Sequence, residues 1–66
     1  MKTKQIIVGV SKEGKHLFLR VNEDGTADWV EDKAQATVYE EYSDALSDWH
    51  GLNKSLLRRI FIANAE

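Results

Sequence analysis

The sequence predicts a small α+β domain, in which one short helix packs on one face of an antiparallel β-meander of three to five strands and a C-terminal strand returns to the sheet. Two acid-glycine turn signals, Glu13-Gly14 and Asp24-Gly25, separate short apolar segments that repeat at a period of eleven residues. An apolar stripe at helical spacing follows Ser43, and a β-branched and aromatic segment lies near the C-terminus. With 66 residues, we expect a single domain over 1–66.

The first half of the chain predicts strands joined by tight turns. Residues 10–19 and 21–30 share one pattern, in which a valine, two polar residues, an acid and a glycine precede an aromatic-aliphatic pair. Each glycine would supply the positive φ that a hairpin turn needs. We therefore expect strands at about 4–10, 16–21 and 27–31.

The middle of the chain predicts a turn, a short strand and a helix. The polar segment 32–36 is expected to form a turn or a single helical turn. The β-branched and aromatic segment 37–40 is expected to form a short fourth strand. Ser43 is the expected N-cap of a helix at about 44–54, which would contain Gly51 in its interior.

The C-terminal segment fits two interpretations. Leu56, Ile60 and Ala63 would suit a continued helix, whereas Ile60-Phe61-Ile62 favours a strand. We favour a strand at about 58–64, because a helix packed on a meander commonly returns its chain to the sheet.

The first and last expected strands are apolar on both faces, which is typical of strands that are buried on both sides. One short helix covers one face of a sheet, so the other face should expose apolar side chains. A patch of that kind usually marks an interface. We predict a homo-oligomer, or burial against another protein, through Ile7, Phe18 and Phe61, with Trp29 as a further exposed candidate.

Acidic and basic residues are sorted along the chain. Residues 1–20 carry five positive charges and one negative, residues 21–53 nine negative and one positive, and residues 54–66 three positive and one negative. The net charge of −2 therefore hides an acidic middle between basic ends. Sorted charge can steer a partner, and the acidic middle argues against duplex nucleic acid as that partner.

Several kinds of chemistry find no support in the sequence. The absence of cysteine excludes disulfides and thiolate zinc sites, and His16 and His50 are far apart, so no metal or cofactor is expected. The serines lie in no nucleophile elbow and the glycines form no phosphate loop. Because no catalytic motif is present, we expect a protein that is not an enzyme. With no signal peptide and no segment long enough to span a bilayer, we expect it to be cytoplasmic.

Two binding hypotheses remain, each beside a plain structural alternative. Acidic side chains gathered on one surface could dock onto a basic protein, although they could equally be solvated or paired with the basic ends. The expected contact residues are Glu23, Asp24, Asp28, Glu31, Asp32, Glu40 and Glu41, and the helix adds Asp44 and Asp48.

In the second hypothesis, arginines and aromatic residues hold a nucleotide-like ligand. Arginine binds phosphate through two parallel hydrogen bonds, and aromatic rings stack on bases. If the second strand neighbours the last one, the arginines could lie together, but they could also be solvated or paired with acids. The candidate residues are Arg20, Arg58, Arg59, Trp29 and Tyr39.

Part of the chain resembles a group of short phage and prophage proteins of Gram-positive bacteria. The resemblance lies in Leu17–Val21, Gly25, Asp28–Asp32, Ala36–Tyr39 and Ser43–Leu46, about half of the chain. It implies a phage accessory protein, acting in the host cytoplasm, that binds and blocks a host protein, as in counter-defence. Alternative roles are an oligomer that sequesters a nucleotide-like ligand and a structural phage component.

Overall fold

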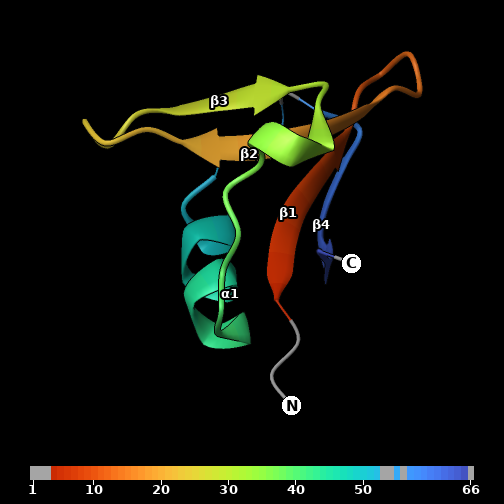
Figure 1. Cartoon of the computed structure of the whole chain (residues 1–66). Helices are drawn as coiled ribbons and strands as arrows, with labels where there is room; N and C mark the ends of the chain where they lie inside the picture. The colour runs from red at the N-terminus through yellow and green to blue at the C-terminus, as the bar shows by residue number, and fades with distance from the viewer. Residues whose placement is uncertain (1–3, 53–54, 56, 66) are drawn as a thin grey trace.

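In the computed structural model, the described residues (4–52, 55 and 57–65) form a four-stranded antiparallel sheet with one α-helix packed against it (Figure 1). In chain order, the elements are β1 (Gln5–Val10), β2 (His16–Val21), β3 (Ala27–Val30), the 3-10 turn η1 (Lys33–Gln35), α1 (Tyr42–His50) and β4 (Arg59–Asn64). The strand order is β3-β2-β1-β4. The predicted α+β class and the returning C-terminal strand are therefore confirmed.

The two hairpin turns form where the acid-glycine signals predict them. Gly14 has φ 91° and Gly25 has φ 89°, a conformation in which a side chain would be strained. Pairing of Val8 with Phe18, and of Phe18 with Val30, sets the register of the two hairpins. The predicted helical turn within 32–36 is η1, for which Asp32 accepts a hydrogen bond from the backbone of Ala34 at 2.9 Å.

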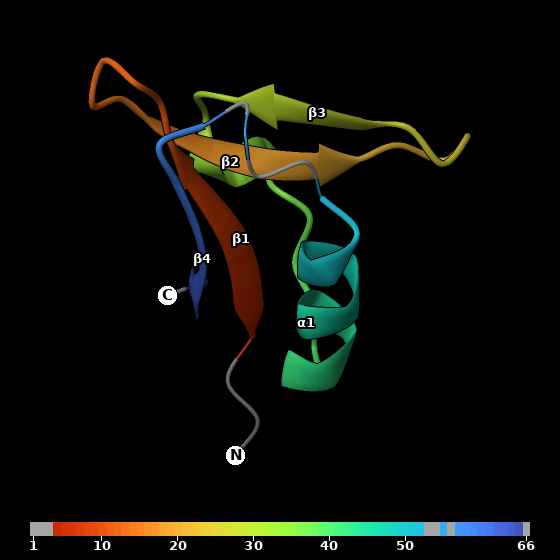
Figure 2. The ribbon, with the colours of Figure 1, turned by 180° about the vertical axis from the view of Figure 1, so that it is seen from behind.

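Strand β1 lies between β2 and β4 (Figure 2). It is buried on both faces, as its sequence predicts. We call the face against which α1 packs the helix face, and the opposite one the second face. Ile7, Leu19 and Ile60 form the core of the helix face. On the second face, Ile6 and Val8 pack with Ala36, and Phe18, Phe61, Ala63 and Ala65 border this cluster.

The expectation that Ile7 lies exposed at an interface is wrong. Ile7 is 0% exposed on the helix face, whereas Phe18 and Phe61 are half-buried on the second face. Successive side chains of a strand point to opposite faces, so Ile7 cannot share one surface with residues that flank Val8. Trp29 is half-buried on the helix face and packs against its core.

The second face is partly covered by the chain that follows η1. Ala36 packs against Ile6 and Val8, which are 2% and 5% exposed. The prediction that α1 would leave this face uncovered is therefore only partly right. What stays accessible is a border of half-buried apolar side chains that includes Phe61.

Residues 37–40 form a bridge rather than the predicted fourth strand. The Thr37 amide donates to the Leu19 carbonyl at 3.0 Å, and Tyr39 exchanges backbone hydrogen bonds of 2.7 and 2.8 Å with Gln5. The ladder between β1 and β2 begins at Val8 and Phe18, so this segment fills the space where these two strands separate. It bonds to a different strand at each position, which prevents a regular ladder.

Helix α1 begins and ends earlier than predicted. Glu41 occupies the N-cap position, and Ser43 lies inside the helix. Gly51 is the C-cap, with φ −82°, rather than an interior residue. The predicted extension to 53–54 lies outside the described residues. The bridge at Tyr39 explains the early start, because it ends the extended segment just before the helix.

Candidate binding groove

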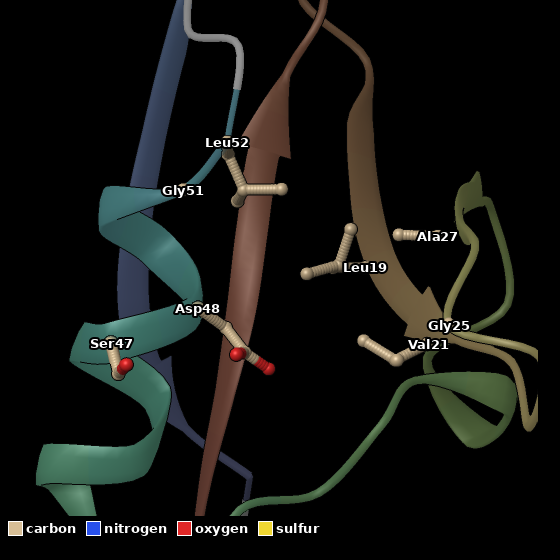
Figure 3. Close-up of a pocket in the computed structure, with 8 residues that line it drawn as sticks. All are labelled: Leu19, Val21, Gly25, Ala27, Ser47, Asp48, Gly51 and Leu52. Atoms are coloured by element: carbon tan, nitrogen blue, oxygen red, sulfur yellow. The ribbon is translucent and has the colours of Figure 1, made fainter.

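A groove of about 290 Å³ lies between α1 and the β2–β3 hairpin, on the helix face (Figure 3). Pockets for small ligands begin at roughly this size, about 300 Å³. The helix side contributes Ser47, Asp48, Gly51 and Leu52, and the hairpin side contributes Leu19, Val21, Gly25 and Ala27. The groove is open to solvent, so it can accept a segment of another molecule.

Among the described residues that line the groove, the one carboxylate, that of Asp48, is hydrogen-bonded to a tyrosine. The Tyr39 hydroxyl donates to Asp48 Oδ2 at 2.6 Å, a distance typical of a bond to a charged oxygen. Burial, together with this bond to Asp48, raises the pKa of Tyr39 above its usual range. Figure 3 shows the Asp48 side chain extending from α1 toward the β2 side of the groove.

The walls around Asp48 are mostly apolar. Leu19 is 1% exposed at the base and Val21 is 36% exposed at the rim. Ala27 and Leu52 complete this surface, and no lysine or arginine is among the described residues that line it. The groove therefore combines an apolar surface with the exposed, hydrogen-bonded carboxylate of Asp48.

Further acids lie next to the groove. Asp44 precedes Asp48 by one helical turn, on the same side of α1. Glu23 and Asp24 immediately precede the lining residue Gly25 in the β2–β3 turn. The hydroxyl and amide of Thr26 both donate to Asp24 and lower its pKa, so it keeps its negative charge to lower pH.

The other predicted acids lie elsewhere and several have local partners. Asp28 accepts a hydrogen bond from Asn22 at 3.0 Å and pairs across the ladder with Arg20. Glu31 forms an ion pair with Lys15 at 3.5 Å. Asp32 caps η1, and the exposed residues Glu40 and Glu41 precede α1. The predicted acidic set is thus divided among several places, and Asp48 is its only member among the described residues that line the groove.

The candidate nucleotide-binding residues are separated by the fold. Strand β1 lies between β2 and β4, so the condition that would bring Arg20 next to Arg58 and Arg59 is not met. Arg59 stacks over Phe61, with its guanidinium carbon 5.2 Å from the ring centre. Trp29 and Tyr39 pack on the helix face, opposite to Phe61. These residues therefore do not form one pocket.

Sequence reasoning missed the pairing of Tyr39 with Asp48. It placed Asp48 on the helix and Tyr39 in a strand, but nothing in the spacing of nine residues predicts that their side chains meet. The apolar walls were also missed, because Val21 and Ala27 fit the ordinary alternation of a half-buried hairpin.

The described residues contain no group of three histidine, aspartate or glutamate side chains that could hold a metal ion. Helix α1 has nine residues, and within the described ranges no helix meets the length and hydropathy of a bilayer span. In comparisons with known proteins, no family model matches the chain, and no curated protein or solved structure is significantly similar to it.

Proposed function

We propose that this is a non-enzymatic binding protein that docks a basic segment of another protein in the groove between α1 and the β2–β3 hairpin. One observation carries the proposal: the Asp48 carboxylate is held by the Tyr39 hydroxyl at 2.6 Å beside the apolar walls of an open groove. A fixed carboxylate loses less conformational freedom on binding than a mobile one, so it can contribute more to affinity.

A lysine or arginine side chain matches this groove in shape and charge. Such a side chain has an apolar stem and a charged head. The stem would lie on Leu19, Val21 and Leu52 while the head meets Asp48. Neighbouring acids such as Asp44 and Glu23 would attract further basic residues and speed up encounter with the partner.

The resemblance to phage accessory proteins suggests the identity of the partner. It supports a host protein in the bacterial cytoplasm, which this protein would block by occupying a basic surface, as in counter-defence. The separation of Arg20 from Arg59 does not favour a nucleotide-like ligand. The alternative of a structural phage component has no specific observation in its favour.

The proposal is tested by titrating the isotope-labelled protein with a short arginine-rich peptide and following backbone amide shifts by NMR. We expect shifts at Val21, Gly25 and the end of α1, with little change at Phe61 on the second face. Asp48→Asn should weaken binding by about tenfold, because hydrogen bonds to charged groups contribute roughly 1.5–3 kcal/mol. In a pull-down from host lysate, Asp48→Asn should likewise retain less of the partner protein than the wild type does.

The matched control is Asp28→Asn, which removes the same charge from the ladder position opposite Arg20, outside the groove lining. This variant should bind the peptide nearly as well as the wild type. Equal weakening by both substitutions would mean that net charge alone attracts the peptide, and the groove would then not be the binding site. Shifts confined to the second face would also refute the proposal.

A further inference from the structure

Strand β4 has an outer edge whose backbone groups can be assigned from the ladder. The Ala65 amide donates to the Lys4 carbonyl at 2.9 Å, and β4 pairs with β1 in antiparallel register. Hydrogen-bonded pairs alternate in such a ladder, so the backbone of Phe61 and Ala63 faces β1. The N–H and C=O groups of Ile60, Ile62 and Asn64 therefore point away from the sheet.

The environment of Ile60 agrees with this assignment. Its carbonyl accepts a hydrogen bond from the indole nitrogen of Trp49 at 3.0 Å, so the helix covers the outer edge at this position. Beyond it, no described residue hydrogen-bonds to the outward backbone groups of Ile62 or Asn64. The open part of the edge thus begins just after Ile60.

This open edge lacks the usual protection against pairing. Natural sheets guard their edges with charges, prolines or very short strands. Strand β3, at the other edge, has four residues and carries Asp28. Strand β4 has six residues; its one charged residue is Arg59 at the start of the strand, and neither charge nor proline occurs between Ile60 and Asn64. An unguarded edge with β-branched and aromatic residues is a template for another strand.

We propose that the outer edge of β4 pairs with β4 of a second copy, antiparallel about a two-fold axis at Ala63, to form one continuous sheet. In this register Ile62 lies opposite Asn64 of the second copy, and the two symmetric pairs make four backbone hydrogen bonds. A register centred on Ile62 would need the Ile60 carbonyl, which Trp49 already occupies. The indole therefore disfavours that register.

In the same register, the apolar border on the second face of one copy continues into that of the other copy. Phe61 would lie opposite Ala65 of the second copy, and the two Ala63 residues would face each other. These three residues are half-buried in the single chain. The contact is small compared with standard interfaces, which bury at least about 1,200 Å², so we expect a weak, concentration-dependent dimer. It leaves the groove free, because the groove involves β2 and the hairpin rather than β4.

A first experiment uses Ala63→Cys, since the chain has no cysteine of its own. Residues on the two-fold axis form a non-hydrogen-bonded pair, with Cα atoms about 4.5 Å apart, within the range of disulfides. In a glutathione redox buffer we expect most of this variant to become a covalent dimer. Asn64→Cys, one residue away but off the axis, and Glu13→Cys, in the β1–β2 turn, should remain largely monomeric.

A second experiment removes one outward donor. Asn64→Pro deletes an N–H that faces away from β1, a position at which edge strands tolerate proline. In sedimentation equilibrium the wild type should rise with concentration from 7.5 kDa toward twice that mass, whereas Asn64→Pro should stay at 7.5 kDa. Asn64→Ala is the control, because it loses the side-chain bond to Gln5 but keeps the amide.

Either experiment can overturn the proposal. A wild type that stays at 7.5 kDa at millimolar concentration would exclude the dimer. The edge of β4 could then pair only with a strand from another protein. Masses well beyond the dimer would indicate open stacking instead of two-fold closure. Disulfide formation no faster in Ala63→Cys than in Asn64→Cys would refute the register.

Discussion

Tyr39 connects three separate parts of the chain. Its backbone pairs with Gln5 in β1, its ring packs in the core of the helix face, and its hydroxyl donates to Asp48 on α1. The same hydroxyl orients the carboxylate of the proposed groove. A single side chain thus supports both the fold and the proposed site, which makes it a sensitive place to test the two together.

We expect Tyr39→Phe to destabilise the protein by about 1–2 kcal/mol, because the lost hydrogen bond is to a carboxylate but lies at an exposed position. The effect should also depend on pH. The pKa of Tyr39 is raised in the folded state, so its contribution to stability is present below about pH 10, the usual tyrosine value, and is lost as the pH rises toward the folded value. Urea denaturation should therefore show a smaller alkaline loss of stability in Tyr39→Phe than in the wild type.

Tyr42→Phe is the control for this prediction, because Tyr42 is 57% exposed at the start of α1. It should keep the alkaline profile of the wild type. If Tyr39→Phe also kept that profile, the hydrogen bond to Asp48 would not stabilise the folded protein. NMR shifts of Asp48 in the two variants would show directly whether the carboxylate is reoriented.

Among the elements, β1 depends on Gly9 for its packing on the helix face. A Cβ built at Gly9 would lie 2.8 Å from the Trp29 ring and would also meet the side chain of Leu57. Glycine is needed here for close approach and not for a special backbone angle. Its absence of a side chain lets a tryptophan from β3 reach across β2 to the central strand.

We expect Gly9→Ala to destabilise the protein by about 1–3 kcal/mol, the usual cost of overpacking a core. Gly51→Ala is the matched control, because its Cβ would meet only the Asp48 carbonyl at 3.6 Å, an ordinary contact. It should be neutral or slightly stabilising. Thermal unfolding of both variants measures the difference, and equal melting temperatures would contradict the packing argument.

In the molecule as a whole, stability depends on a small core. Ile7 and Leu19 are the largest fully buried side chains among the described residues. A domain of this length has a total stability of roughly 3–10 kcal/mol, from about 0.05–0.15 kcal/mol per residue. A single cavity in the core can therefore remove a large share of it.

We expect Ile7→Ala to cost about 2–5 kcal/mol, the range for such truncations in cores, and to leave a substantial unfolded fraction at room temperature. Val38→Ala, at a side chain that is 48% exposed, should cost much less. Circular dichroism during urea titration compares the two. A small effect of Ile7→Ala would mean that the core collapses around the missing methyl groups.

The strands and turns were predictable because their signals are local. Gly14 and Gly25 need positive φ in their turns, and the β-branched and aromatic residues Ile60–Ile62 favour a strand over the helical alternative. The start of α1 was not predictable from Ser43, because the bridge between Tyr39 and Gln5 decides where the extended segment ends. The preference of serine for the N-cap position is worth only about 1 kcal/mol, so the backbone hydrogen bonds between Tyr39 and Gln5 can override it.

The face on which a strand residue lies requires the register as well. The apolar run of β1 predicts burial on both sides, but the pattern alone does not distinguish Ile7 from Phe61 as an interface residue. Pairing with β2 and β4 places Ile7 under α1 and Phe61 on the second face. The candidate arginines were separated in the same way, by the position of β1 in the strand order.

The α+β class, the hairpin turns and the returning strand thus follow from residues close together in the chain, because each depends on backbone preference and alternation. The groove cannot be predicted from residues that are close together in the chain. It requires Asp48, the hydroxyl of Tyr39 and the walls of the β2–β3 hairpin to meet, and they meet only when α1 packs on the helix face. Side chains that are far apart in sequence have no preference for one another until the sheet and helix bring them within bonding distance.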